Sequence, residues 1–160
     1  MADNRELTLH ANEVFESLCE RLDSMNLHYS CDPEEYIIRF DYQGEDLPMN
    51  FTFIIDEDRQ LLRVYSRIPI TVPKEKGLEM AVATCIATNE LLDGSFDYDM
   101  KTGEIFFRLT ATFLETDIGD GLFDHLVSYS IFAVEQYNDK FFGLAKGMLN
   151  VNDFLTANNQ

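Results

Sequence analysis

The chain of 160 residues is long enough for one compact domain, and its content of 46% hydrophobic and 12% aromatic residues excludes a disordered segment. Its formal net charge of −17 disfavours nucleic acid and anionic membranes as partners, because both attract basic groups. The first residues carry no basic segment followed by an apolar run, and the three cysteines are odd in number and far apart. We therefore expect a cytoplasmic protein without a signal peptide, a membrane span or a disulfide framework.

The first predicted element is a helix near residues 10–25. Its apolar side chains recur every three or four positions and form one stripe, made of Val14, Phe15, Leu18, Leu22 and Met25. Asp32-Pro33 interrupts the chain, and three runs with period-two alternation follow, at residues 35–43, 48–56 and 60–68. Short polar connections between these runs favour an antiparallel meander.

Pro69 and Pro73 separate these strands from a second helix, predicted over residues 74–92. Its expected buried stripe consists of Leu78, Val82, Cys85, Ile86 and Leu92, widened by Ala81, Ala83 and Ala87. A β-hairpin with strands at 95–100 and 104–113 comes next. Gly103 suits its turn, because short hairpin loops need the positive φ that glycine adopts readily.

The last predicted helix spans residues 122–144, with Asp120 as its N-cap. The polar segments 1–7 and 148–160 are expected to be termini outside a single domain that spans residues 8–147. The order of elements is α-β-β-β-α-β-β-α. It predicts an α+β fold in which three helices pack on a five-stranded, mainly antiparallel sheet.

No group of side chains in the sequence has the spacing of a catalytic, cofactor or metal site. His28 and Cys31 are three residues apart, but a zinc site needs a second such pair. The segment Gly119-Asp120-Gly121 lacks the third glycine and the βαβ unit of a phosphate loop. His125 lies one helical turn before Ser128, without a third group to orient it. We therefore expect no catalytic residue, no bound metal and no cofactor.

Two stretches of the sequence carry a recognisable pattern. The first contains Asn89-Glu90-Leu91-Leu92, Gly94-Ser95-Phe96, Asp99, Gly103-Glu104 and Phe107-Arg108, and the second is Tyr137-Asn138-Asp139-Lys140-Phe141-Phe142. This pattern resembles that of the bacterial YbjN-domain proteins, over residues 10–147 by the order of elements and over 89–113 and 122–147 by residue type. The resemblance implies a fold similar to that of type III secretion chaperones and a regulatory role in sensory transduction. It implies no catalytic residue.

The last helix is apolar on more than one face. Leu122, Leu126, Tyr129 and Ala133 form one stripe, whereas other large side chains turn in other directions. The predicted interface consists of this second set together with small residues of the middle helix: Phe123, Val127, Ile131, Val134, Ala83 and Ala87. We expect it to join two copies of the chain in a homodimer. The alternative is that these side chains lie under the first helix or the C-terminal tail.

The absence of recognisable chemistry, the second apolar face and the resemblance favour one class of function. We expect a non-enzymatic protein-interaction module that acts on another protein, as a regulator of sensory transduction or as a chaperone-like binder. The alternative is a small-ligand sensor, or a small enzyme whose site is assembled on the sheet from residues distant in sequence.

Overall fold

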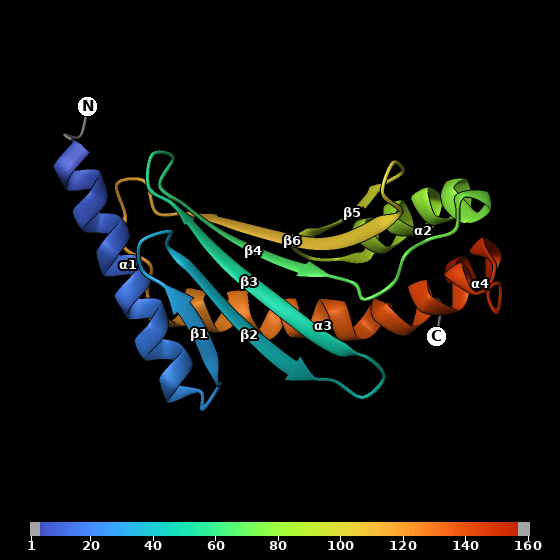
Figure 1. Ribbon diagram of the computed structural model, residues 1–160, viewed down its shortest axis with the longest axis horizontal. Coiled ribbons are helices and arrows are strands. Elements are labelled where there is room, and N and C mark those ends of the chain that lie inside the picture. Colours follow the sequence, from blue (N-terminus) through green and yellow to red (C-terminus); the bar gives the residue numbers. More distant parts are fainter. Residues whose placement is uncertain (1–3, 157–160) are drawn as a thin grey trace.

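One antiparallel sheet, covered by helices on one face, makes up the computed structural model, which describes residues 4–156 (Figure 1). The helices are α1 (Asn4–Ser24), α2 (Gly77–Glu90), α3 (Asp120–Ala145) and α4 (Val151–Thr156), with a short 3-10 helix, η1 (Lys74–Lys76), before α2. The strands are β1 (Tyr29–Asp32), β2 (Ile37–Gln43), β3 (Pro48–Asp56), β4 (Leu61–Arg67), β5 (Ser95–Asp99) and β6 (Glu104–Thr112). No helix in this part of the chain is both long enough and apolar enough to cross a membrane.

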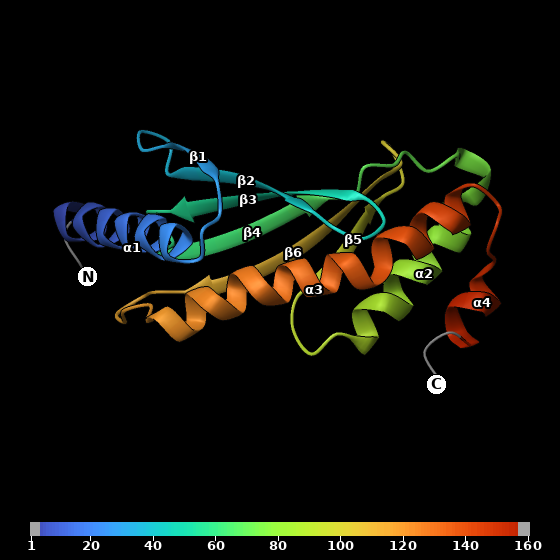
Figure 2. The same cartoon turned by 90° about the horizontal axis from the view of Figure 1, so that it is seen from below.

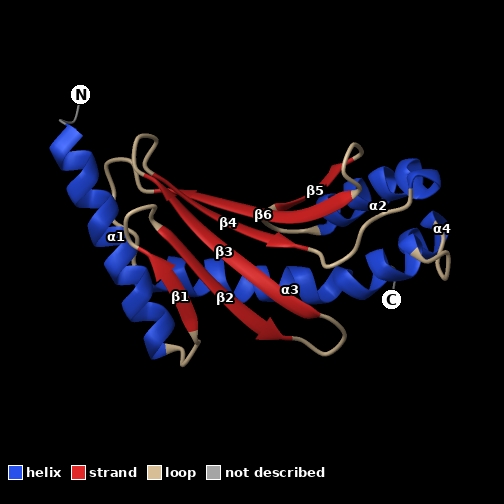
Figure 3. Ribbon diagram, viewed as in Figure 1, coloured by secondary structure: helices blue, strands red, loops and turns tan. Residues whose placement is uncertain are grey.

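The strands follow the order β1-β2-β3-β4-β6-β5, and every neighbouring pair is antiparallel (Figure 3). The register places apolar side chains in rows across the sheet. One such row runs through Ile38, Phe53, Val64 and Leu109, none of which is more than 2% exposed. The period-two alternation of each strand therefore directs one set of side chains into a continuous core.

The helices lie on one side of the sheet, and the other side faces solvent (Figure 2). α3 runs along the sheet from the end near α1 to the end near α4, while α2 packs beside it under β5. α1 covers the opposite end, against β3 and α3. Arg21 of α1 fixes this contact through two hydrogen bonds of 2.6 Å to the Asp124 carboxylate of α3. The core thus lies between the sheet and a layer of helices.

All five predicted strands are present, but the fold has one more strand and one more helix than the sequence predicts. β1 was missed because it has only four residues and ends at Asp32-Pro33. α4 was missed because its six residues are mostly polar, although its Phe154 is only 1% exposed and stacks on Phe141 of α3. The predicted domain limits of 8–147 are therefore too narrow, since α1 begins at Asn4 and α4 ends at Thr156. Residues 1–3 and 157–160 of the predicted polar termini lie outside the described residues.

The predicted stripe of α2 is right for its small residues Ala83 and Ala87, which are buried, but wrong for most of its larger ones. Leu78 is 76% exposed, Val82 is 50% exposed and Cys85 is exposed, whereas the buried residues of α2 are Gly77, Met80, Ala83, Thr84 and Ala87. Leu92, at the end of the predicted stripe, lies after the helix and is 95% exposed. A helix surface made mainly of small side chains can approach a strand and a second helix closely, and α2 turns that surface inward. Its larger apolar side chains consequently face solvent.

The N-terminal end of α3 also differs from its prediction. Asp120 is the first residue of the helix rather than its cap, and Gly119 occupies the cap position without a side-chain hydrogen bond. The Gly119 carbonyl accepts hydrogen bonds from the amides of Leu122 and Phe123, at 3.0 and 3.2 Å.

Candidate functional site

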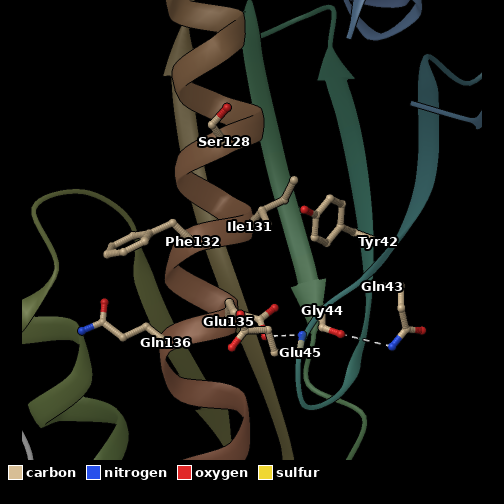
Figure 4. Close-up of a pocket in the computed structure, with 9 residues that line it drawn as sticks. All are labelled: Tyr42, Gln43, Gly44, Glu45, Ser128, Ile131, Phe132, Glu135 and Gln136. Carbon is tan, nitrogen blue, oxygen red and sulfur yellow. Dashed lines mark hydrogen bonds between the residues drawn. The ribbon is translucent and has the colours of Figure 1, made fainter. Parts of the chain in front are cut away.

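A groove of about 560 Å³ lies between α3 and the segment that ends β2 (Figure 4). α3 contributes one wall, with positions three or four residues apart that share one side of the helix. The other wall is the end of β2 and the turn that follows it. The residues that line the groove are Tyr42, Gln43, Gly44, Glu45, Ser128, Ile131, Phe132, Glu135 and Gln136.

The groove exists because the helix layer does not cover the last part of β2. Ile38, Phe40 and Tyr42 alternate on the helix-facing side of the sheet, and the first two are at most 2% exposed. Tyr42 belongs to the same row but is 38% exposed. α1 covers the other end of the strands, so that only α3 lies near this end (Figure 1). The groove is therefore an uncovered part of the core-facing side of the sheet.

Its lower end in Figure 4 is closed by a contact between the β2–β3 turn and α3. The Glu45 amide donates a 2.7 Å hydrogen bond to Glu135 Oε1. A Cβ atom at Gly44 would collide with the Glu135 carboxylate and would lie 2.8 Å from Met49 Cε. Glycine therefore allows the turn to approach α3 closely enough for Glu135 to hold it. This carboxylate is a fixed negative charge at the end of an apolar groove.

Phe132 of α3 extends the apolar wall of the groove onto the surface. Its side chain is 58% exposed and lies 6.0 Å from the Tyr129 ring, which in turn stacks on His125 at 5.1 Å. The Tyr129 hydroxyl accepts hydrogen bonds from the amides of Leu92 and Asp93 at 2.9 and 3.2 Å. We call His125, Tyr129 and Phe132 the aromatic ladder. It links the groove to the end of α2.

The structure corrects the predicted interface on the last helix. Five of its six residues are no more than 1% exposed, namely Phe123, Val127, Val134, Ala83 and Ala87. α3 lies between the sheet, α1 and α2, so that it is buried on several sides without a second copy of the chain. Ile131 alone of the six is partly exposed, and the fold brings it beside Tyr42 in the groove.

Two groove residues were not recognised from the sequence as site residues. Tyr42 continues the alternation of a buried strand, and Phe132 resembles any other apolar residue of a helix that is apolar on several faces. Only the position of α1 decides that Tyr42 stays uncovered. No local pattern identifies that position.

The residues considered for chemistry are separate in the fold. His125 Nε2 lies 3.0 Å from Asp93 Oδ2 and stacks on Tyr129, rather than orienting towards Ser128 as part of a catalytic group. His28 follows α1 and Cys31 lies in β1. Within residues 4–156, no three His, Cys, Asp or Glu side chains are placed to hold a metal ion.

Three arginines on the open face of the sheet, where a scattered site was the alternative expectation, are paired with carboxylates, whereas Arg39 on the same face is exposed. Arg63 lies 3.3 Å from Asp56, Arg67 lies 2.8 Å from Glu104, and Arg108 lies 2.9 Å from Asp97. Their charges are thus compensated by neighbouring carboxylates. The groove between α3 and β2 combines the apolar side chains Tyr42, Ile131 and Phe132 with polar ones at its edges.

Comparison of the chain with protein-family models, with curated proteins and with solved structures finds no match in any of the three.

Proposed function

We propose that this chain is a non-enzymatic protein-interaction module, and that its groove holds an apolar and positively charged segment of another protein. The single observation that supports this proposal is the uncovered end of the sheet beside α3. There Tyr42 and Phe132 remain 38% and 58% exposed, next to a core that is otherwise closed. Exposed aromatic side chains beside a hollow are typical of binding surfaces, since their burial releases water from a large apolar area.

The charge of the groove favours a basic partner. Glu45 and Glu135 line it, and no Lys or Arg does. The formal net charge of −17 adds a long-range attraction for a positively charged segment. A partner that offers one large apolar side chain flanked by Lys or Arg would satisfy both the walls and the carboxylates.

The biological role that we propose is that of a cytoplasmic regulator of sensory transduction or a chaperone-like binder of another protein. It rests on the resemblance to the YbjN-domain family, which implies a fold like that of type III secretion chaperones. Apart from β1, the order of elements from α1 to α3 is the one expected for that family. β1 and α4 are additions to this order. Either role requires a surface that holds part of another chain, which the groove offers.

A small-ligand sensor is the second candidate, and the size of the groove favours it. About 560 Å³ falls within the range of small-molecule sites. Such sites normally bury most of their ligand, however, whereas Phe132 at the rim is 58% exposed. A segment of protein that extends beyond the groove fits this openness better.

A peptide array distinguishes these candidates. We expect the chain to retain peptides that carry one aromatic or aliphatic residue between lysines or arginines, and not the same peptides with glutamate in place of the basic residues. Phe132→Asp should lower the affinity for the retained peptides by tenfold or more, since an aromatic anchor often contributes about 2 kcal/mol to binding. Glu135→Gln should weaken mainly the basic peptides and should reduce the dependence of binding on salt.

Leu114→Asp is the matched control. Leu114 is 59% exposed, close to the 58% of Phe132, but it lies after β6 and outside the groove. Binding that survives Phe132→Asp, or that Leu114→Asp weakens equally, would contradict the groove as the site.

A further inference from the structure

The end of α1 and the strand β1 bring two cysteines together that are twelve residues apart in the sequence. The chain turns back directly after α1, where the Leu27 amide donates a 3.1 Å hydrogen bond to the Leu22 carbonyl. β1 then runs beside the helix it has just left, and the Tyr29 hydroxyl donates a 3.3 Å hydrogen bond to Asp23 Oδ2. This contact fixes the position of β1 along α1.

The positions of the two cysteines relative to this contact follow from the regular geometry of the helix and the strand. Cys19 lies four residues before Asp23 on the same side of α1, about 6 Å back along the helix axis. Cys31 lies two residues after Tyr29 on the same side of β1, about 7 Å further along the strand. Because β1 runs back along α1, the two steps bring Cys31 beside Cys19.

Two further observations indicate that both thiols lie between α1 and β1. Cys31 is opposite Ile38 of β2, which is 0% exposed on the helix-covered side of the sheet, so the Cys31 side chain faces α1. Tyr29 and Cys31 are both among the neighbouring groups that shift the pKa of Cys19. Cys19 is half-buried, Cys31 is exposed and neither is in a disulfide.

We propose that Cys19 and Cys31 are a dithiol modification site, which a low-molecular-weight disulfide such as glutathione disulfide converts to an intramolecular disulfide. The Cys31 thiolate attacks one sulfur of the small disulfide and releases one small thiolate, which takes up a proton. The Cys19 thiolate then attacks the Cys31 sulfur of the mixed disulfide and releases the second small thiol. The protein loses two electrons and two protons, and the small disulfide is reduced to two thiols.

The exposed Cys31 is the entry point, and Cys19 sets the rate of closure. Burial raises the pKa of Cys19 to about 11, and the neighbouring Cys31 and Asp23 add to this effect, while the nearby Tyr29 hydroxyl opposes it. Little Cys19 thiolate is therefore present at neutral pH. The second step should become faster by up to about tenfold for each unit of pH between pH 7 and pH 9.

The full-length chain treated with glutathione disulfide tests this proposal. Peptide mapping should find a bond between Cys19 and Cys31, and Cys85 should be found only as the free thiol or as its own glutathione adduct. The melting temperature of the oxidised chain should rise by roughly 5–10 °C, because the bond restricts the unfolded chain. Dithiothreitol should reverse both changes.

Single substitutions provide the controls. Cys85→Ser should leave the new bond unchanged, whereas Cys31→Ser, at an exposed position, should abolish it without affecting the fold. A glutathione adduct that persists on Cys31, a bond between two chains, or no oxidation of either cysteine would overturn the proposal.

Discussion

The Tyr137 hydroxyl donates a 2.6 Å hydrogen bond to Glu90 Oε2 and so joins the middle of α3 to the last residue of α2. Tyr137 is 0% exposed, and its ring also contacts Phe96 of β5 and Phe154 of α4. The helix α2, the edge strand β5 and the C-terminal helix α4 therefore all meet α3 at one side chain.

Removing only the hydroxyl tests the strength of this junction. We expect Tyr137→Phe to lower the free energy of unfolding by about 1–2 kcal/mol, because a hydrogen bond to a carboxylate is lost while the ring packing is kept. Urea denaturation measures the change. Tyr42→Phe is the control, since the Tyr42 hydroxyl has no hydrogen bond to another described residue, and it should change stability by less than about 0.5 kcal/mol.

The contact between Tyr137 and Glu90 predicts that the stability of the fold decreases at alkaline pH. Burial, followed by the hydrogen bond to Glu90, raises the pKa of Tyr137 above its ordinary value. Above about pH 10 the unfolded chain loses this proton while the folded chain keeps it, so the folded state binds more protons and stability falls as pH rises. The slope from Tyr137 is at most about 1.4 kcal/mol per pH unit. Urea denaturation at about pH 9, 10 and 11 should show a smaller slope for Tyr137→Phe than for the unsubstituted chain; equal slopes would refute the assignment.

The β5–β6 turn requires glycine at position 103, as the sequence predicts. Gly103 has φ of 75°, and a Cβ atom there would lie 2.7 Å from the Val72 carbonyl oxygen. We expect Gly103→Val to lower the free energy of unfolding by roughly 2–4 kcal/mol, because it adds backbone strain and this collision. Gly121→Ala is the control, because nothing lies within 4 Å of its added Cβ atom and alanine favours the helix. Thermal unfolding that is unchanged in Gly103→Val would contradict the requirement.

Thr88 of α2 caps the outer edge of β5. Its hydroxyl accepts a 2.9 Å hydrogen bond from the Phe96 amide and donates a 3.3 Å bond to the Phe96 carbonyl. Thr88→Val keeps the shape of the side chain but leaves the amide and the carbonyl of Phe96 without this partner. We therefore expect the free energy of unfolding to fall by about 1–2 kcal/mol and hydrogen exchange at the Phe96 amide to become faster. Thr110→Val on the open face of the sheet should have little effect. Unchanged exchange at Phe96 would show that the edge does not depend on Thr88.

The homodimer remains a prediction, and one exposed apolar surface that suits it is the outer side of α2. Leu78 and Val82 expose 76% and 50% of their surface there, while the α3 residues first expected to form the interface are buried. We propose that a second copy covers this stripe, so that light scattering at micromolar concentration gives a dimer mass. Val82→Asp should yield the monomer and Leu114→Asp should not. A monomer mass for the unsubstituted chain would contradict the predicted dimer.

The sequence by itself determined the five longer strands and the three longer helices, but not the short elements β1 and α4. A strand was expected at residues 48–56, and its alternate residues Met49, Phe51, Phe53 and Ile55 are at most 4% exposed, because every second side chain of a strand shares a face whatever lies beyond it. The positive φ of Gly103 was predictable for a similar reason, since a short turn imposes it locally.

Only the tertiary structure decided which face of each helix is buried and where the sheet stays uncovered. α2 turns Ala83 and Ala87 inward and Leu78 outward, although hydrophobicity favours the reverse, because close packing against β5 and α3 selects the small side chains. The groove at Tyr42 and the meeting of Cys19 with Cys31 depend on where α1 ends and how β1 returns along it. These are relations between elements, and periodicity within a single element carries no information about them.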